Sequence, residues 1–205
     1  MTTPQALGKA SSLEEARREA AGCRACGLWR LGTQTVFGAG SDDARLLVVG
    51  EQPGDQEDLQ GEPFVGPAGR LLGEALAEAG IDRESAYLTN AVKHFKWRPK
   101  GNRRIHDTPS WSEVKACLPW LELELALVRP EVVVLLGATA AQALLGREFR
   151  VTRQRGRVRD APFAQPLVAT VHPSSVLRAP REKRKRERAA FVTDLCVAAE
   201  LLAAR

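Results

Sequence analysis

The sequence lacks any long hydrophobic run. A transmembrane helix needs about 18 or more consecutive apolar residues, and no such run occurs in the 205 residues. The N-terminal stretch MTTPQALGKASS has neither the basic region nor the apolar region of a secretory signal. We therefore predict a cytoplasmic protein that has no membrane partner.

Cysteine is scarce, with only four residues in the chain. Intracellular proteins rarely form disulfides. Cys23 and Cys26 have C-x-x-C spacing, whereas Cys117 and Cys196 lie far from them and from each other. This spacing favours metal binding over a disulfide framework.

Histidine is scarcer still, and two of the three histidines share one basic segment, KHFKWRPKGNRRIHDTPS, at residues 93–110. The chain carries a formal net charge of +5. Such a charge fits attraction to a polyanion but does not require one. The segment is compatible with a solvated loop, a nucleic-acid contact or a catalytic site.

Short apolar runs alternate with helical patterns along the chain. At 44% apolar residues, the chain can bury one ordinary core. Alternating strands and helices predict an α/β domain of three layers, α/β/α, around a central and mainly parallel four-stranded sheet. We expect a single domain over residues 1–205, with a flexible N-terminus at 1–10. Strands are predicted within 45–50, 85–92, 131–137 and 166–175, and helices within 11–22, 66–80, 111–130 (interrupted near Pro119), 138–146 and 181–204.

Three polar motifs follow predicted strands: GEQPGDQEDLQGEPFVGPAG at 50–69, NAVKH at 90–94 and HPSSVLR at 172–178. Sites in parallel sheets gather at the carboxyl ends of strands, so we expect these motifs to meet. Together they resemble the uracil-DNA glycosylase superfamily, especially its iron–sulfur branch and, within it, the UdgX-type proteins. The resemblance covers roughly residues 15–200. It implies a DNA-repair enzyme that hydrolyses the N-glycosyl bond of uracil.

The resemblance also implies a pocket that holds a flipped-out uracil. Phe64 can stack on the base, and the Asn90 amide can pair with uracil O4 and N3–H. His172 can donate a hydrogen bond to uracil O2 as the leaving group gains charge. Gln52 and Asp55 are expected to hold the base or the backbone near the sugar. Taken singly, Phe64 is as typical of a core aromatic ring, Asn90 is more typical of a turn, and His172 is compatible with a buried, hydrogen-bonded histidine.

Iron–sulfur members of the superfamily carry four cysteines, the third just after an N-x-V-K sequence. In this chain that position is His94. The resemblance therefore implies a [4Fe–4S] cluster held by Cys23, Cys26, His94 and Cys117, with an imidazole in place of one thiolate. Three sulfurs and one nitrogen also suit zinc, so spacing alone leaves the metal open. Cys196 is expected to be a core residue of the last helix.

Twenty-two residues separate His94 from Cys117. Within them, NRRIH resembles the KRRIH loop of UdgX-type proteins, with Asn102 in place of the usual lysine. The resemblance implies that His106 points towards the sugar C1′ and attacks it once uracil departs. Glu51 is expected to accept the other ring N–H of His106. The protein would then be trapped on DNA after essentially one turnover.

The expected partner is uracil-containing DNA, single-stranded as well as double-stranded, bound by a monomer in a bacterial cytoplasm and, through DNA, at the nucleoid. Two other interpretations stay open. In the first, the protein is a conventional multiple-turnover glycosylase whose His106 only contacts phosphate. In the second, it is a non-enzymatic iron–sulfur or zinc module that binds nucleic acid. The residues expected to contact DNA are Arg103, Arg104, Ser174 and Arg178.

Overall fold

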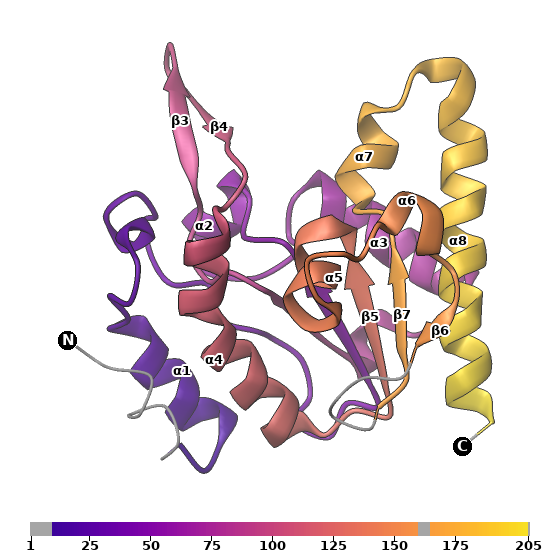
Figure 1. Cartoon of the computed structure of the whole chain (residues 1–205), viewed down its shortest axis with the longest axis horizontal. Helices are drawn as coiled ribbons and strands as arrows, with labels where there is room; N and C mark the ends of the chain where they lie inside the picture. Colours follow the sequence, from indigo (N-terminus) through magenta and orange to yellow (C-terminus); the bar gives the residue numbers. More distant parts are fainter. Residues whose placement is uncertain (1–9, 160–164, 205) are drawn as a thin grey trace.

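The computed structural model describes residues 10–159 and 165–204, and the chain forms three layers around one main sheet (Figure 1). The strand order is β2-β1-β5-β7-β6. The predicted α/β/α fold with a mainly parallel sheet is confirmed. The sheet has one more strand than predicted, because the two residues of β6 are too few to produce a sequence pattern. The strands are β1 (Leu46–Gly50), β2 (Ala86–Asn90), β5 (Val132–Leu136) and β7 (Leu167–Thr170), all parallel, and β6 (Val158–Arg159), antiparallel to β7.

Strand β1 shows why the sheet is covered on both faces. All five of its residues are buried, as expected for a parallel strand between two helical layers. Alternate side chains enter separate apolar clusters, with Leu46 and Val48 on one face and Leu47 and Val49 on the other. The first face is covered by α3 (Pro67–Glu78) and α8 (Arg181–Ala203), and the second by α4 (Trp111–Val128) and α5 (Gly137–Leu145).

Helix α4 runs through Pro119 without a break, so the predicted interruption is wrong. Proline removes a backbone donor and costs about 3 kcal/mol inside a helix. Trp120 and Leu121, immediately after it, are buried. Each large apolar side chain contributes roughly 1.5–3 kcal/mol on burial, which offsets the loss. A capping box between Ser110 and Glu113 also closes the N-terminus of the helix.

Residues 97–106 of the basic segment at 93–110 form a hairpin that projects beyond the sheet (Figure 1). Its strands are β3 (Trp97–Lys100) and β4 (Arg103–His106). His106 therefore ends a strand and pairs in register with Trp97. The remaining elements are α1 (Leu13–Ala21), η2 (Gly27–Arg30), α2 (Asp55–Gln60), η3 (Arg83–Ser85), α6 (Val151–Gln154) and α7 (Pro173–Arg178).

In the described part of the chain, no helix has both the length and the apolar character needed to cross a bilayer. The predicted flexible N-terminus, residues 1–10, lies outside the described residues except for Ala10. That residue is buried and belongs to the apolar cluster beside α1.

Candidate active site

The three motifs meet at the carboxyl edge of the sheet. Gly50 and Asn90 are register partners at the ends of β1 and β2. His172 lies just beyond β7 and is the N-cap residue of α7. The expectation that parallel strands would bring these residues together is met by the fold.

Gly50 allows two predicted base-binding residues to pack close together. A Cβ atom at Gly50 would lie 2.3 Å from Asn90 Oδ1 and 2.7 Å from Phe64 Cζ. Both side chains are buried. Phe64 has a φ of 59°, a left-handed conformation that costs a non-glycine residue about 1–3 kcal/mol. Its carbonyl accepts a hydrogen bond from Arg83 at 2.9 Å, which helps to hold this backbone.

His172 is arranged as a neutral hydrogen-bond donor. Burial lowers its pKa to about 4, and electrostatic interactions with His106 and Arg178 act in the same direction. Its Nδ1 accepts the backbone N–H of Ser174 at 3.2 Å, so the ring hydrogen is on Nε2. The rings of His172 and Phe64 are nearly parallel, with centroids 6.4 Å apart. Ser174, a predicted DNA contact, also places its hydroxyl 2.8 Å from Nδ1.

His106 and Glu51 are in contact, as the resemblance to UdgX-type proteins implied. His106 Nε2 lies 3.3 Å from Glu51 Oε1. The imidazole is 47% exposed, whereas the carboxylate is 21% exposed. Phe95 lies against the imidazole at a centroid distance of 6.2 Å. The imidazole is therefore accessible to a substrate and has an acceptor for one ring N–H.

Gln52 joins the two ends of the hairpin. Its Nε2 donates to the carbonyls of Lys96 and Asp107, each at 3.1 Å. Its Oε1 accepts the backbone N–H of Lys96, also at 3.1 Å. The side-chain amide is thus fully engaged at the hairpin base. We therefore assign Gln52 to holding the two ends of the His106 hairpin together, in place of the predicted contact to uracil or to the DNA backbone near the sugar.

Arg104 is likewise engaged inside the protein. Its guanidinium donates to Asp55 Oδ1 and to Asp58 Oδ2, both at 2.6 Å. Asp58 is fully buried, and a buried carboxylate needs a charged partner. The guanidinium also stacks over the rings of Phe95 and Trp97. We therefore assign Arg104 to fastening the hairpin onto α2 in place of the predicted phosphate contact. The predicted contact of Asp55, whose side chain is 44% exposed, to the base or to the backbone near the sugar stays a prediction.

No sequence pattern predicted the roles of Asp58 and Arg83. Asp58 belongs to the acidic run DQED, which is typical of a solvated helix start, and nothing in the sequence signals its burial. Arg83 lies in a short turn with no motif. By contrast, the predicted DNA contacts Arg103 and Arg178 are exposed, as a phosphate contact requires.

The three cysteines predicted to bind metal share one apolar region beside α1 and α4. Cys117 is buried, and Cys23 and Cys26 pack against the same cluster. Cys117 Sγ accepts the backbone N–H of Lys93 at 3.2 Å. His94 Nε2 lies 3.0 Å from the Thr35 hydroxyl. The remaining cysteine, Cys196, packs against the core beneath α8, as predicted.

The chemistry of these side chains fits a buried metal group. Burial raises the pKa of Cys117 to about 12 and also raises that of Cys26. A thiolate in such surroundings needs a compensating positive charge, which a metal supplies. Burial lowers the pKa of His94, which favours the neutral, ligating imidazole. Among residues 10–159 and 165–204, no three ligating side chains are placed to hold a single metal ion, so the donor types and their burial support a metal here, whereas their placement does not.

Comparison with known proteins adds a family match. The model described as the uracil DNA glycosylase superfamily matches residues 37–196, which include all three motifs and the hairpin. The chain is 40% identical over 183 residues to a type-4 uracil-DNA glycosylase of Archaeoglobus fulgidus, covering 86% of this chain and 88% of that protein. A type-4 enzyme of Thermotoga maritima is 42% identical over 157 residues, with coverages of 76% and 78%. One of Sulfurisphaera tokodaii is 33% identical over 181 residues, with coverages of 84% and 79%.

Proposed function

Because the chain belongs to the uracil DNA glycosylase superfamily, we propose that it excises uracil from DNA and then captures the DNA covalently through His106. The observation that carries the proposal is the contact between His106 and Glu51. It lies at the edge of the sheet where Asn90 ends β2 and where His172 caps α7 just beyond β7. A nucleophile and a hydrogen-bond acceptor for its ring N–H are thus beside the proposed uracil pocket.

The first step is departure of uracil. Phe64 stacks on the flipped base, and the Asn90 amide pairs with O4 and N3–H, a pattern that cytosine mismatches. As the bond between C1′ and N1 breaks, its electron pair leaves with the base. The Nε2–H of neutral His172 then donates to O2, where negative charge develops. The sugar is left electron-poor at C1′.

The second step is capture of the sugar. One ring nitrogen of His106 donates its lone pair to C1′, and a new C–N bond forms. The other ring nitrogen keeps its hydrogen and donates a hydrogen bond to the Glu51 carboxylate, which stabilises the resulting imidazolium. Breaking the adduct would require the imidazole to leave and water to enter a filled pocket. The protein therefore stops after essentially one turnover.

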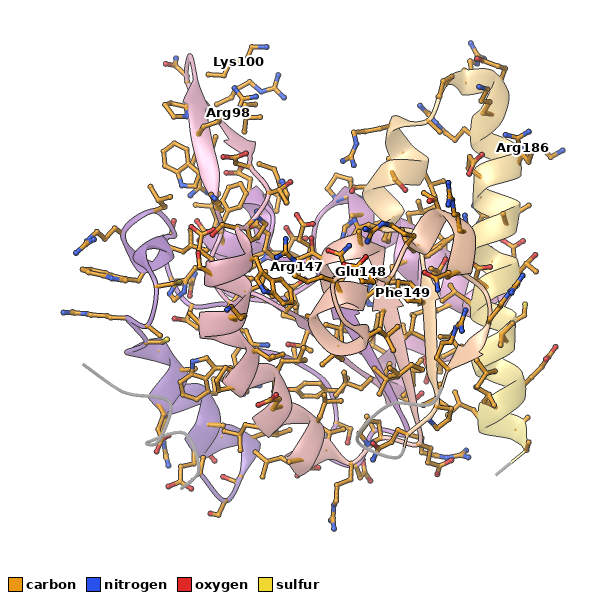
Figure 2. The ribbon with its side chains drawn as sticks, viewed as in Figure 1. Arg98, Lys100, Arg147, Glu148, Phe149 and Arg186 are labelled. Atoms are coloured by element: carbon orange, nitrogen blue, oxygen red, sulfur yellow. The ribbon has the colours of Figure 1, made fainter. Side chains whose placement is uncertain are left out.

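DNA is proposed to lie across the carboxyl edge, between the hairpin and the α7–α8 region. Figure 2 shows Arg98 and Lys100 on the hairpin and Arg186 near the start of α8. Arg103 and Arg178 are exposed on the same two sides. Phosphate contacts of this kind position the backbone without reading sequence. We propose that a monomer binds single-stranded as well as double-stranded substrate.

A denaturing gel with a uracil-containing oligonucleotide tests the proposal. Covalent capture gives a band that survives heat and detergent. A conventional multiple-turnover glycosylase gives an alkali-labile abasic site and no such band. A non-enzymatic nucleic-acid-binding module gives neither product. An oligonucleotide with thymine in place of uracil serves as the control.

We further propose that Cys23, Cys26, His94 and Cys117 hold a [4Fe–4S] cluster. The proposal rests on the resemblance to the iron–sulfur branch and on the donor set of three sulfurs and one nitrogen. When bound, the cluster would supply structural cross-linking. It would join the segment after α1, the loop after β2 and helix α4.

We expect the purified protein to be brown and to contain iron. His94→Ala should lower the iron content and the visible absorption, because it removes one of the ligands. Cys196→Ala is the control and should leave both unchanged, since Cys196 packs in the core away from the site. Colourless protein with stoichiometric zinc would contradict the cluster. Loss of the visible absorption in Cys196→Ala but not in His94→Ala would show that Cys196, and not His94, is the fourth ligand.

Asn90→Asp is expected to weaken uracil processing strongly. The substitution replaces an amide donor by an acceptor that faces uracil O4, which is itself an acceptor. An unpaired buried group costs about 1–3 kcal/mol, and more when it is charged, so uracil release should slow by at least about 5- to 150-fold. The measurement is free uracil under single-turnover conditions. Asn102→Asp, at the exposed hairpin tip, is the matched control, and equal rates in the two variants would show that Asn90 does not contact the base.

A further inference from the structure

The two carboxylate oxygens of Glu51 have different partners. Oε1 lies 3.3 Å from His106 Nε2. Oε2 accepts a hydrogen bond from the hydroxyl of Thr139 at 2.5 Å. Thr139 belongs to the first turn of α5 and lies 88 positions from Glu51 in the sequence. The carboxylate therefore bridges His106 on the hairpin and a helix that starts at the end of β5.

The start of α5 also contacts the other half of the site. Gly137, its first residue, has a φ of +90°, a left-handed conformation that suits glycine. A Cβ atom at this position would lie 3.1 Å from His172 Cβ. The same helical turn is thus next to His172, which serves uracil departure, and next to Glu51, which serves capture. The first turn of α5 therefore contacts both His172 and Glu51.

We propose that Thr139 is a positioning residue that fixes the Glu51 carboxylate with Oε1 directed at His106. The inference rests on the proposed function, and it assigns to Thr139 a role in capture rather than in uracil departure. Hydrogen bonds to an ionised carboxylate are short and strong. A bond to Oε2 restrains the rotation of the whole carboxylate, because both oxygens move together. Oε1 then stays available to accept the ring N–H of His106.

Capture of the sugar by His106 depends on this restraint more than departure of uracil does. A ring nitrogen can attack C1′ only with a free lone pair, so the hydrogen must stay on the nitrogen that faces Glu51. If the carboxylate rotates away, the other tautomer is populated and the imidazolium loses its acceptor. Water then competes better for the electron-poor sugar. Uracil departure uses His172 and Asn90, neither of which contacts the Thr139 hydroxyl by hydrogen bond.

The test compares Thr139→Val, which keeps the shape but removes the hydroxyl, with Thr139→Ser, which keeps the hydroxyl. Free uracil and cross-linked DNA are measured in the same reaction. We expect Thr139→Val to lower the ratio of cross-linked DNA to free uracil by about tenfold or more, the effect of one hydrogen bond to a charged group. Thr139→Ser should restore the ratio. Uracil release should change by less than about twofold in both variants, since the leaving-group contacts are intact.

Two results would overturn the inference. An unchanged ratio in Thr139→Val would show that Thr139 does not control capture. A parallel fall of uracil release and capture in both variants, together with a lower melting temperature, would show a merely structural role.

A second measurement separates this inference from the proposed function. The chain has three histidines, so the ring ¹⁵N signals of His106 can be assigned by comparison with His106→Ser. We expect Thr139→Val to change the tautomer signature of His106 and Thr139→Ser to preserve it, with or without DNA. If the wild type forms no adduct, the covalent proposal fails, whereas an unchanged tautomer signature in Thr139→Val is what would refute the positioning role.

Discussion

His106→Ser is expected to abolish the heat-stable DNA adduct while uracil release continues. The two steps use different groups, because Asn90 and His172 serve departure and His106 serves capture. Removing the imidazole opens space for a water beside Glu51, which can accept its proton. The variant should then act as a slow glycosylase that leaves an abasic site. Free uracil and cross-linked DNA, measured together in wild type and variant, give the answer.

Two further variants sharpen this prediction. His106→Gln fills the space with a side chain that is a poor nucleophile, so both the adduct and water entry should be lost. Asp107→Ser changes the next exposed residue and keeps the backbone carbonyl that Gln52 contacts, so it should still form the adduct. A heat-stable adduct in His106→Ser would mean that another residue is the nucleophile, and the hairpin would return to being a phosphate contact.

The sequence predicted the layers and the location of the site because both depend on short-range patterns. Buried parallel strands are continuous apolar runs, as at Leu46–Gly50, and polar motifs directly after them must meet at one edge. The structure adds the register, which pairs Gly50 with Asn90. The contact between His106 and Glu51 did not follow from pattern. It was expected only from the resemblance to a family.

The sequence did not predict how the hairpin is fastened, because that depends on which long side chains meet in space. Arg104 looked like a phosphate contact, since a basic loop is typical of one, yet its charge is used to neutralise the buried Asp58. Gln52 has donors and an acceptor that fit a base and a hairpin equally well. Thr139 lies far from Glu51 in the chain and carries no motif. Such pairings become visible only when the fold is known.

Another such pairing is the buried ion pair between Lys93 and Glu124, whose side chains are 1% and 0% exposed. Lys93 Nζ donates to Glu124 Oε2 at 2.5 Å, to the Thr89 hydroxyl at 2.6 Å and to the Asn90 carbonyl at 2.8 Å. Through the last bond, the pair supports the backbone of the residue proposed to bind uracil.

Glu124 also accepts hydrogen bonds from neutral donors. Its Oε1 accepts the backbone N–H of Gly38 at 2.9 Å and the hydroxyl of Tyr87 at 3.2 Å. Burial, together with the Glu124 carboxylate, raises the pKa of Tyr87 far above its usual range, so this hydroxyl remains a donor. An uncharged glutamine at position 124 can still accept these bonds, whereas an unpaired carboxylate there is costly.

Lys93→Met is therefore expected to destabilise the protein severely. Removing one partner of a buried pair leaves an uncompensated charge and costs about 3–5 kcal/mol in the free energy of unfolding. For a chain of this size that corresponds to a fall in melting temperature of roughly 6–20 °C. Adding Glu124→Gln removes the stranded charge, so the double variant should be more stable than Lys93→Met alone.

The matched control is Lys96→Met, which makes the same change in a more exposed pair. Lys96 contacts Glu113 at 3.0 Å, with both side chains about one-fifth exposed. Such a pair contributes about 1 kcal/mol or less, because water can solvate the partner that remains. Thermal unfolding of the four proteins at one pH measures the difference. Equal melting temperatures for Lys93→Met and Lys96→Met would show that burial does not set the cost. A double variant no more stable than Lys93→Met would show that the stranded carboxylate is not its source.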